Sequence, residues 1–570
     1  MRKRAILISL VIIGNIILTT KAEDNTFCNP LNLDYSFAIG DGSFREAADP
    51  VAILFNDDYY IFASKSGGYW WSHDFKDWHF VKPTGLDINK YAPSVFVIGN
   101  NLYYTSSESG AIYKTTDPKA GEWTYISKPV NWNDPWVFVD TDGKVYGFYG
   151  CSQDGTIDCV QLDPKENFKP IGDPVVCIHT NSKENGFENK GDNNEGGSPW
   201  TEGAAMIKHD NKYYLLYATP GTELRSYCDA YYVSDSPMGP FTLGDNSPVT
   251  RKSLGYVTGT GHGGMFYDKL GKLWTIVTVA ISNKAFFERR LAVFPLEFDE
   301  NGRLYGNTVM GDYPQYLPGT ITDNHFANNR PKWNLLSEGK TAAVSSTFKE
   351  NLSKNAMDED MRTYWSAATG NVGEWYSVDL GAMCTIQAIQ SNFYDSETTY
   401  SSGRNASFTI KYKVEYSTDN SRWNIAFDKS ASTKDTPHDY IQLAEPISAR
   451  YIRITNMGSM PGSGYFALNE FRVFGSKNST IPAAVSSVEA KRLSDERCVN
   501  IQWKEVANAD GYIIRYGIEP DKLWNNYQVW SGNSYPIKSL IVGQTYYFRV
   551  DAYNASGITE GTNIIEVKKN

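Results

Sequence analysis

The stretch Pro199-Trp200-Thr201-Glu202-Gly203 places a carboxylate between a bulky aromatic residue and a glycine. Eleven residues after Glu202, Tyr213 begins the apolar run Tyr213-Tyr214-Leu215-Leu216-Tyr217. The same offset recurs elsewhere in the chain, from Asp49 to Tyr60, Ala92 to Tyr103, Asp134 to Val145 and His262 to Leu273. Five copies of one spacing indicate an internal repeat, which takes precedence over any local pattern.

Each copy of the repeat consists of a short strand, a polar turn and an aromatic strand. The turns are rich in Asn, Asp and Gly, as in Asn56-Asp57-Asp58 and His209-Asp210-Asn211, and this composition is typical of β-hairpins. Units of roughly 40 to 60 residues built from a few antiparallel strands predict the blades of an all-β fold, a five-bladed β-propeller. Since the first strand of every blade lines the central channel, the repeat positions should converge: Asp49, Ala92, Asp134, Glu202 and His262.

The first residues have the features of a secretory signal peptide. Arg2-Lys3-Arg4 is a basic start, Ala5 to Leu18 is mostly apolar, and Thr20-Lys21-Ala22 is a small-x-small cleavage site. The apolar run is too short and too close to the start for a transmembrane segment. We therefore expect export to the periplasm or the extracellular space after cleavage near Ala22.

Composition limits the classes of partner. The chain has 570 residues and a formal net charge of −11, which argues against a nucleic-acid partner. Aromatic residues make up 14% of the chain and suit both β-sheet cores and sugar-stacking surfaces. The seven cysteines leave at least one thiol unpaired within the chain. Cys151 and Cys159 flank a turn and could form a disulfide, or both could be free thiols.

Several motifs in the repeats resemble glycoside hydrolase family 43. The resemblance rests on Asp49-Pro50, Asp134-Pro135 and Trp200-Thr201-Glu202-Gly203. It extends over the whole propeller through further segments: Ser72 to Trp78, Tyr91-Ala92-Pro93, Gly261-His262-Gly263 and Arg289 to Phe298.

The resemblance implies an inverting hydrolase in which Asp49 is the general base and Glu202 the general acid. Inversion requires one carboxylate to activate a water molecule and one carboxylic acid to protonate the leaving oxygen. Asp134 is then the third carboxylate, which raises the pKa of the acid by like-charge repulsion and orients it. The chemistry itself needs no cofactor.

The resemblance also implies residues outside this triad. Arg289 is a substrate contact, although its neighbour Arg290 could hold that place instead. His262 matches a residue that helps to hold a central calcium ion, with a hydrogen-bonded core imidazole as the alternative. Three tryptophans are candidates for stacking on sugar rings or for the core: Trp71, Trp136 and Trp200.

A long polar stretch, Asn181 to Ser198, leads directly into Glu202 and should lie at the mouth of the channel. It could wall off one side and form a pocket for a terminal sugar, or it could be a surface insertion. Its acids Glu184, Glu188 and Glu195 are out of the repeat register and are weaker candidates for the general acid.

Residues 333–475 change in character and resemble a discoidin-like (factor 5/8 type C) module. The matching segments are Asn355 to Trp365, Trp375 to Gly381, Tyr412 to Ser417, Ala449 to Ile454 and Leu468 to Phe471. The resemblance implies a jelly-roll β-sandwich, either a family 32-like carbohydrate-binding module or a structural spacer. It also implies a structural calcium loop, where hard oxygen ligands suit Ca²⁺ and Glu359 replaces a usual glycine: Asp358, Asp360, Thr363 and Glu470.

Residues 476–484 are expected to form a linker, and residues 485–570 resemble a fibronectin type III domain. Trp503 matches the core tryptophan of that immunoglobulin-like sandwich and Tyr546 its corner tyrosine. We expect this domain to be a spacer. The predicted organisation is a signal peptide (1–22), a catalytic propeller (30–320), the discoidin-like module, the linker and the fibronectin-like domain.

These observations predict a secreted, monomeric glycoside hydrolase without a transmembrane segment, which acts from the chain end and removes a terminal sugar from a polysaccharide or oligosaccharide. The family resemblance puts α-L-arabinofuranose first. β-Xylose, β-galactofuranose and β-1,3-linked galactose remain open, because family membership does not fix specificity. A non-catalytic glycan-binding propeller is the alternative from another class.

Overall fold

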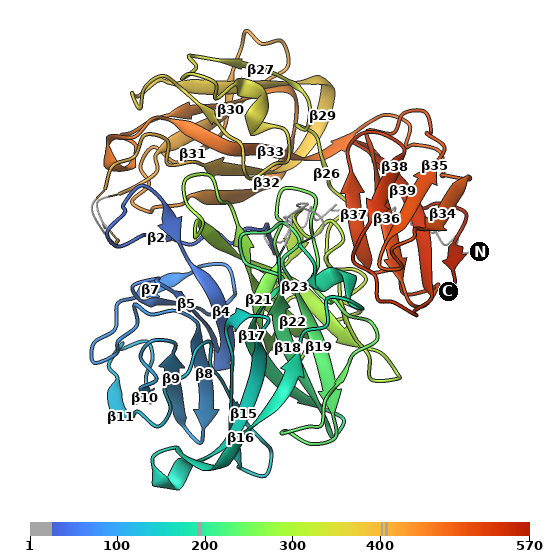
Figure 1. The fold of residues 1–570 in the computed structure, drawn as a ribbon. Coiled ribbons are helices and arrows are strands. Elements are labelled where there is room, and N and C mark those ends of the chain that lie inside the picture. The colour runs from blue at the N-terminus through green and yellow to red at the C-terminus, as the bar shows by residue number, and fades with distance from the viewer. Residues whose placement is uncertain (1–24, 191–196, 401–402, 405–407, 570) are drawn as a thin grey trace, which may run out of the picture.

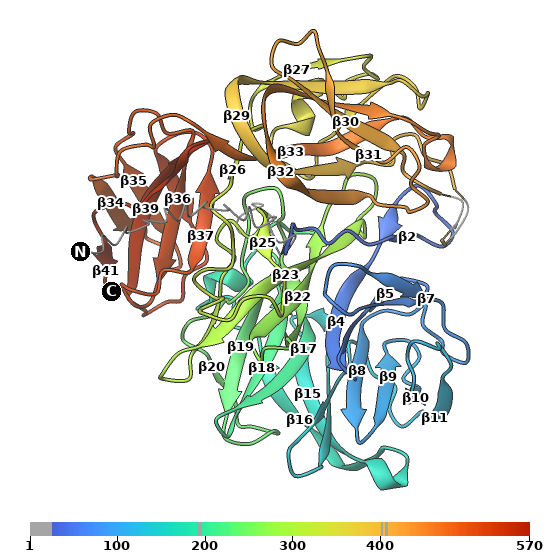
Figure 2. The same ribbon diagram turned by 180° about the vertical axis from the view of Figure 1, so that it is seen from behind.

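The structure, a computed structural model, describes residues 25–190, 197–400, 403–404 and 408–569. The predicted signal peptide lies outside these residues. The fold is all-β, as expected, and three bodies are visible from both sides (Figure 1 and Figure 2). The described helices are short 3₁₀ turns, and no described helix is long and apolar enough to cross a membrane: η1 (Pro164–Glu166), η2 (Gly186–Glu188), η3 (Ser353–Ala356) and η4 (Pro461–Ser463).

The first body contains five antiparallel sheets that follow one another along the chain. The first sheet contains β4 (Ala48–Phe55), β5 (Asp58–Ser64), β6 (Tyr69–Ser72) and β7 (His79–Val81). The second contains β8 (Pro93–Ile98), β9 (Asn101–Ser106), β10 (Ile112–Thr115) and β11 (Thr124–Ser127). The third contains β12 (Trp136–Val139), β13 (Val145–Tyr149), β15 (Thr156–Asp163) and β16 (Lys169–His179).

The fourth sheet contains β14 (Ser152–Gln153), β17 (Trp200–His209), β18 (Lys212–Thr219), β19 (Cys228–Ser234) and β20 (Thr242–Leu243). The fifth contains β21 (Gly261–Tyr267), β22 (Leu273–Ala280), β23 (Arg289–Phe298) and β24 (Leu304–Gly306). Contacts between first strands close a ring, from β4 through β8, β12, β17 and β21 back to β4. This radial arrangement is that of a β-propeller.

The polar turns of the repeat form the tight hairpins that their composition predicts. Asn56 and Asp57 both have positive φ, as do Asp210 and Asn211, and two such residues in succession make a type I′ turn. Outside the ring, β1 (Thr26–Phe27) pairs with β25 (Gln315–Tyr316), so the two ends of the propeller region meet. β2 (Ser36–Phe37) pairs with β3 (Arg45–Glu46).

The second body is an eight-stranded antiparallel assembly with one large apolar core. Its central strand β29 (Trp375–Phe393) is flanked by β32 (His438–Asn456) and β33 (Ala467–Lys477). The other strands are β26 (Asn334–Leu335), β27 (Thr341–Val344), β28 (Trp365–Ser366), β30 (Tyr412–Ser417) and β31 (Asn424–Asp428). It covers the part of the chain in which a discoidin-like module was expected.

The third body is a sandwich of two sheets. One contains β34 (Val488–Arg492), β35 (Val499–Trp503) and β38 (Ser534–Ile537). The other contains β36 (Gly511–Gly517), β37 (Asn525–Val529), β39 (Tyr546–Asn554), β40 (Gly557–Thr559) and β41 (Ile565–Val567). Trp503 is buried between them, and the Tyr546 hydroxyl accepts a hydrogen bond from the Ile541 amide at 3.0 Å. The fibronectin type III resemblance itself stays a prediction.

Residues from all three bodies share one apolar cluster. Val309, Met310 and Tyr313 follow the last propeller sheet, and they pack with residues of both C-terminal bodies, including Phe474 and Ile513. A buried polar contact lies beside this cluster, where Arg472 of β33 bonds to the Asp312 carbonyl. The three bodies are therefore packed together as one unit.

Candidate active site

The repeat positions converge at the centre of the ring. Nδ1 of His262 lies 3.3 Å from Oδ1 of Asp49 and 3.8 Å from Oδ2 of Asp134. All three side chains are buried. Asp49, Ala92, Asp134 and His262 also share one backbone conformation, with φ of 50°, 45°, 48° and 52°. Positive φ is uncommon for residues other than glycine, so its recurrence at equivalent positions shows that this backbone conformation belongs to the repeat.

Glu202 does not occupy this repeat position, which corrects the register expected from the sequence. β17 pairs Glu202 with Ala218 and then skips to Ala205, as β4 pairs Ala48 with Ser64 and skips to Val51. Glu202 is thus equivalent to Ala48, and Gly203, with φ of 66°, is equivalent to Asp49. Because neighbouring residues of a strand point to opposite sides, Glu202 reaches the centre from a different direction.

Hydroxyl groups of second strands hold the first strand of the next sheet. The Asp49 amide donates to Oγ1 of Thr278 at 2.7 Å, and the Ala92 amide donates to Oγ of Ser64 at 2.7 Å. The Asp134 amide donates to Oγ of Ser107 at 2.6 Å. Ser64 and Ser107 also donate to the carboxylates of Asp49 and Asp134, at 2.6 and 2.9 Å. The same contacts thus join neighbouring sheets and orient the carboxylates.

Two side chains from outside the repeat positions bond directly to Glu202. The Tyr227 hydroxyl donates to Oε1 at 2.5 Å, and the Cys151 thiol donates to Oε2 at 3.4 Å. The Trp200 indole donates to the Cys151 sulfur at 3.4 Å. Cys151 reaches this place because β14, which follows it, pairs with β17 next to Glu202. One ligand-type atom from each of Asp134, Cys151 and Glu202 lies within 4.8 Å of the other two.

The acid and base candidates have opposite pKa shifts. Burial, reinforced by the Asp134 carboxylate, raises the pKa of Glu202 to about 7. Burial also opposes charge on Asp49, but Arg289, His262 and the Ser64 hydroxyl together outweigh it and lower the pKa of that carboxyl. Near neutral pH, Glu202 can therefore keep a proton while Asp49 is a carboxylate. This is the division of roles that general acid and base catalysis needs.

His262 lies among these carboxylates and responds to their charge. Burial lowers the pKa of the imidazole, but Asp49, Asp134 and Glu202 together raise it above its ordinary value. Burial raises the pKa of Asp134, with His262 acting against it. The role of His262 at a central calcium ion stays a prediction.

The structure brings Arg289, and not Arg290, to the site. Arg289 is buried, donates to Oε1 of Glu46 at 2.7 Å and lies 3.3 Å from Oδ1 of Asp49. Arg290 points away along the next position of β23 and bonds to His438 of the second body at 3.0 Å. Alternation along the strand separates these two roles.

A cavity of about 490 Å³ opens over the carboxylates. Its wall contains Asp49, Asp134, Glu202 and Arg289, together with aromatic side chains that can face a sugar ring: Tyr91, Trp200, Phe286 and Phe287. Trp200 is 39% exposed and is the predicted tryptophan that the structure places in this wall.

The other two predicted tryptophans do not line the cavity. Trp71 lies on β6, the third strand of its sheet, where its ring stacks on His79 and carries the Lys119 ammonium 4.0 Å from its centre. Trp136 lies deeper, packed against apolar clusters of the propeller and beside Gly264. A third strand is remote from the axis, and this removes Trp71 from the site.

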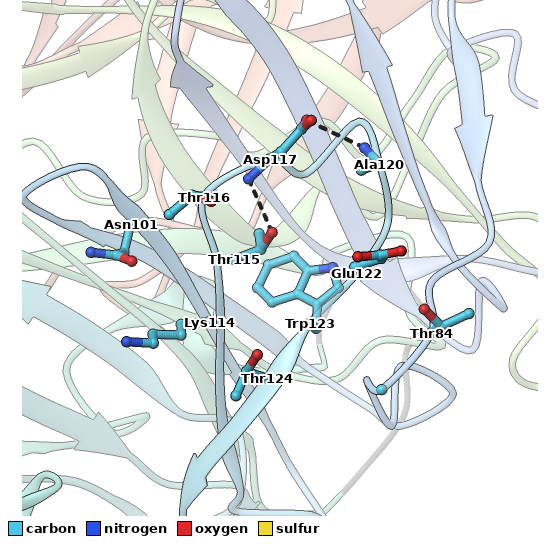
Figure 3. Close-up of a pocket in the computed structure, with 11 residues that line it drawn as sticks. Thr84, Asn101, Lys114, Thr115, Thr116, Asp117, Ala120, Glu122, Trp123 and Thr124 are labelled. Carbon is cyan, nitrogen blue, oxygen red and sulfur yellow. Dashed lines mark hydrogen bonds between the residues drawn. The ribbon is translucent and has the colours of Figure 1, made fainter.

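A second cavity of about 510 Å³ lies in the second sheet, around Trp123 (Figure 3). One of its two acids, Asp117, is engaged in the local turn, where its carboxylate accepts from the Ala120 amide at 3.3 Å. This cavity holds none of the predicted catalytic residues. The cavity at the ring centre is thus the candidate active site.

The expected calcium loop of the second body has a mixed donor set. Asp358 accepts from the Thr363 hydroxyl at 2.9 Å, and Oε2 of buried Glu470 has no hydrogen-bond partner among the described residues. These oxygens suit a hard cation. Asp360, however, is held by Arg225 of the propeller at 2.7 and 2.8 Å. Glu359 adopts the left-handed conformation of the glycine that it replaces, with φ of 56°.

Cys151 and Cys159 are both free thiols, so the bridge considered between them is not formed. Of the functional residues, sequence reasoning missed Tyr227, Cys151, Ser64 and Ser107. The two serines had a signal, because each follows its repeat position by fifteen residues. Tyr227 and Cys151 follow no repeat spacing and become neighbours of Glu202 only in the folded chain.

Two family models and one curated protein match this chain. Residues 44–304 match the family described as glycosyl hydrolases family 43, and residues 340–471 match the F5/8 type C domain. The chain is 26% identical over 279 residues to xylosidase/arabinosidase 43A of Humicola insolens, covering 37% of this chain and 82% of that protein.

Among solved structures, a glycoside hydrolase has a TM-score of 0.44 at 19% identity and covers 78% of this chain and 99% of its own. An α-L-arabinofuranosidase of Clostridium thermocellum has a TM-score of 0.35 at 18% identity, covering 45% of this chain and 93% of its own. The family matches carry the conclusion: the chain contains a glycosyl hydrolase family 43 domain followed by an F5/8 type C domain, and the protein is an O-glycosyl hydrolase.

Proposed function

We propose that the protein is an exported, exo-acting, inverting glycoside hydrolase that releases a terminal sugar, with α-L-arabinofuranose as the first candidate. The observation that carries this proposal is the pair of oppositely shifted carboxyl groups in one cavity: a Glu202 with its pKa raised to about 7 and an Asp49 with its pKa lowered. Such a pair supplies the acid and the base of an inverting reaction.

In this mechanism Asp49 takes a proton from the attacking water and Glu202 gives its proton to the leaving oxygen. Ser64 and Arg289 hold the Asp49 carboxylate through Oδ2 and Oδ1. Tyr227 and Cys151 hold the two oxygens of Glu202. As Glu202 becomes a carboxylate, these two donors stabilise the charge that it gains.

The form of the cavity supports release of a terminal sugar. Lys190 and Glu223 lie in its wall, with Nζ of Lys190 3.7 Å from Oε1 of Glu223. We propose that this ion pair limits how far a long chain can extend beyond the site. The described part of the polar stretch before Glu202 supplies Lys190, in accord with the expected role of this stretch as a wall.

The name of the Humicola insolens relative, a xylosidase/arabinosidase, favours a pentose. We therefore place α-L-arabinofuranosides and β-xylosides before β-galactofuranosides and β-1,3-galactosides. A pentose has one carbon and one hydroxyl group fewer than galactose, so glycosides with the same leaving group can separate these classes.

Hydrolysis of aryl glycosides tests the proposal. We expect the mature protein to release one sugar from a panel of arabinofuranoside, xyloside, galactofuranoside and galactoside. Glu202→Gln should lose about 10²-fold or more in kcat with a glycoside whose leaving group needs protonation. Glu184→Gln, which changes an exposed acid of the preceding segment, is the matched control and should act like the wild type. Equal rates for Glu202→Gln and the wild type would reject the assignment of the acid.

A further inference from the structure

We infer that both C-terminal bodies are working parts of the active site, because they hold the segments that form the wall of the sugar cavity. This inference deepens the proposed function and rests on it. Three wall segments are involved, residues 181–190, 220–227 and 282–288, and each contributes at least one residue to the cavity lining. Each also bonds to a C-terminal body.

Residues 181–190 are fixed to the third body through their backbone. The Gly186 amide donates to the Leu540 carbonyl at 2.8 Å, and the Val542 amide donates to the Glu184 carbonyl at 2.9 Å. Nη1 of Arg497 donates to the Ser182 carbonyl at 2.6 Å. These bonds surround an isolated antiparallel β-bridge between Asn185 of the wall segment and Ile541 of a separate domain.

The packing at Gly186 leaves no room for a side chain. A Cβ placed there would lie 2.6 Å from the Lys538 carbonyl oxygen and 2.7 Å from that of Leu540. On the propeller side, the same segment is tied by Glu188, which is fully buried and accepts from the Tyr217 hydroxyl at 2.6 Å. The segment is thus held between the propeller and the third body.

Residues 220–227 are fixed to the second body. Nη2 of Arg362 donates to the Glu223 carbonyl at 2.6 Å. Arg225 donates to both carboxylate oxygens of Asp360, at 2.7 and 2.8 Å. This segment contains cavity residues and ends at Tyr227, the hydrogen-bond donor to the acid.

Residues 282–288 carry Phe286 and Phe287 into the cavity wall and also bond to the second body. The Asn283 side chain donates to the Met361 carbonyl at 3.0 Å, and the Lys284 ammonium donates to the Asp395 carbonyl. Three separate wall segments therefore form hydrogen bonds or ion pairs with residues outside the propeller.

The ion pair of Lys190 and Glu223 joins two of these segments within the cavity wall. One partner is held by the third body and the other by the second. The position of this pair in the cavity wall therefore depends on both domains. We assign the two domains a positioning role in substrate specificity, in place of the spacer role expected for the third body.

Two single substitutions in the full chain test this inference. Gly186→Ala should force the segment off Lys538 and Leu540, and Arg362→Ala should release the Glu223 carbonyl. We expect each to lower kcat/KM for the cleaved glycoside about tenfold, mainly through KM, since small misplacements of positioning groups are costly. Arg362→Lys, which keeps a donor, should recover part of the loss.

Matched controls are Lys183→Ala, an exposed residue of the same segment, and Arg450→Ala, which pairs with Asp379 within the second body. Both should keep the KM of the wild type. Amide hydrogen exchange of residues 181–190 and 220–227 gives a readout that does not depend on activity, and it should rise in Gly186→Ala and Arg362→Ala respectively.

Unchanged exchange in both variants would overturn the inference, whether or not the wild type cleaves the chosen glycoside. Raised exchange with an unchanged KM would overturn the positioning role. A lower melting temperature with an unchanged KM would likewise show that the contact serves only stability. A wild type that cleaves no substrate would reject the proposed function instead, and the exchange data would still decide whether the domains hold the wall.

Discussion

At the scale of single residues, the charge of Glu202 depends on two neighbours that act in opposite directions. The Asp134 carboxylate raises the pKa of Glu202, whereas the hydrogen bond from Tyr227 lowers it. Below about pH 7 the acid carries its proton, and activity should fall as the pH rises through that value. The alkaline limb of kcat/KM therefore reports this residue.

Substitution of the two neighbours should move that limb in opposite directions. Asp134→Asn removes the repelling charge, so Glu202 should lose its proton at lower pH. The alkaline limb of kcat/KM should therefore shift by about 1 pH unit toward lower pH. Tyr227→Phe removes a hydrogen-bond donor to the carboxylate, so the alkaline limb should shift toward higher pH by a similar amount. The measurement is kcat/KM against pH for both variants and the wild type. A shift of both limbs in one direction would contradict this account of the site.

The residues of the site differ in how far they could be predicted from sequence. Asp49, Asp134 and His262 share a repeat position, and their convergence follows from the ring. Tyr227 and Cys151 could not be found in this way, because one lies in a connecting segment and the other is placed by the short pairing of β14 with β17. The choice between Arg289 and Arg290 could not be made from the sequence. The two residues are adjacent, and which side of the strand faces the site is known only from the folded structure.

At the scale of elements, the first strands carry a bulge with one residue of positive φ, and the fourth sheet fills that place with Gly203. Counting residues misplaced Glu202 by one position, because Tyr213, which was matched with Tyr60, directly precedes the true equivalent, Tyr214. The turns of the first and fourth sheets are both two residues long, so Gly203 lies eleven residues before Tyr214, as Asp49 lies eleven residues before Tyr60. The repeat predicted five units of a few antiparallel strands, but the register needed the pairing itself.

Gly203 should not tolerate a side chain. A Cβ would lie 2.9 Å from the His262 ring, and alanine would also have to adopt a left-handed backbone. We expect Gly203→Ala to cost about 2 kcal/mol of stability and to lower kcat, because it displaces the imidazole from the carboxylates. Thermal unfolding and kinetics with the preferred glycoside check this.

Gly143→Ala is the matched control for that substitution. Gly143 lies in the hairpin of the third sheet and also has positive φ, 83°, but a Cβ added to it would meet no other atom within 4 Å. This variant should lose about 1 kcal/mol of stability and keep its kcat. A Gly203→Ala enzyme that matched it in both respects would show that the contact with His262 carries no catalytic weight.

At the scale of the whole molecule, the domain order was predictable but the contacts between domains were not. The modules have separate sequence signatures, and a linker was expected at residues 476–484. Arg45 of β3 shows the difference, since it is fully buried between Asp395 and Asp435 of the second body, at 2.9 and 2.6 Å. No sequence pattern within one module indicates its partner in another.

The shared apolar cluster predicts cooperative unfolding of the full chain. Residues of all three bodies lose packing together when any one of them separates, so calorimetry should show one main transition. A chain ending at Tyr316 should expose this cluster and aggregate at a lower temperature. Three well-separated transitions in the full chain would contradict this coupling.

The shared cluster also bears on how such a protein can change over generations. Domains that are joined only by a flexible linker can be exchanged between proteins. The resulting chimaera has the ligand preference of the domain that was introduced. Here Val309, Phe474 and Ile513 come from different domains but complete one interior. A domain introduced from another protein would need a matching interface. Recombination at the boundary after residue 316 should therefore yield few folded chimaeras, unless both C-terminal domains are kept together with the propeller.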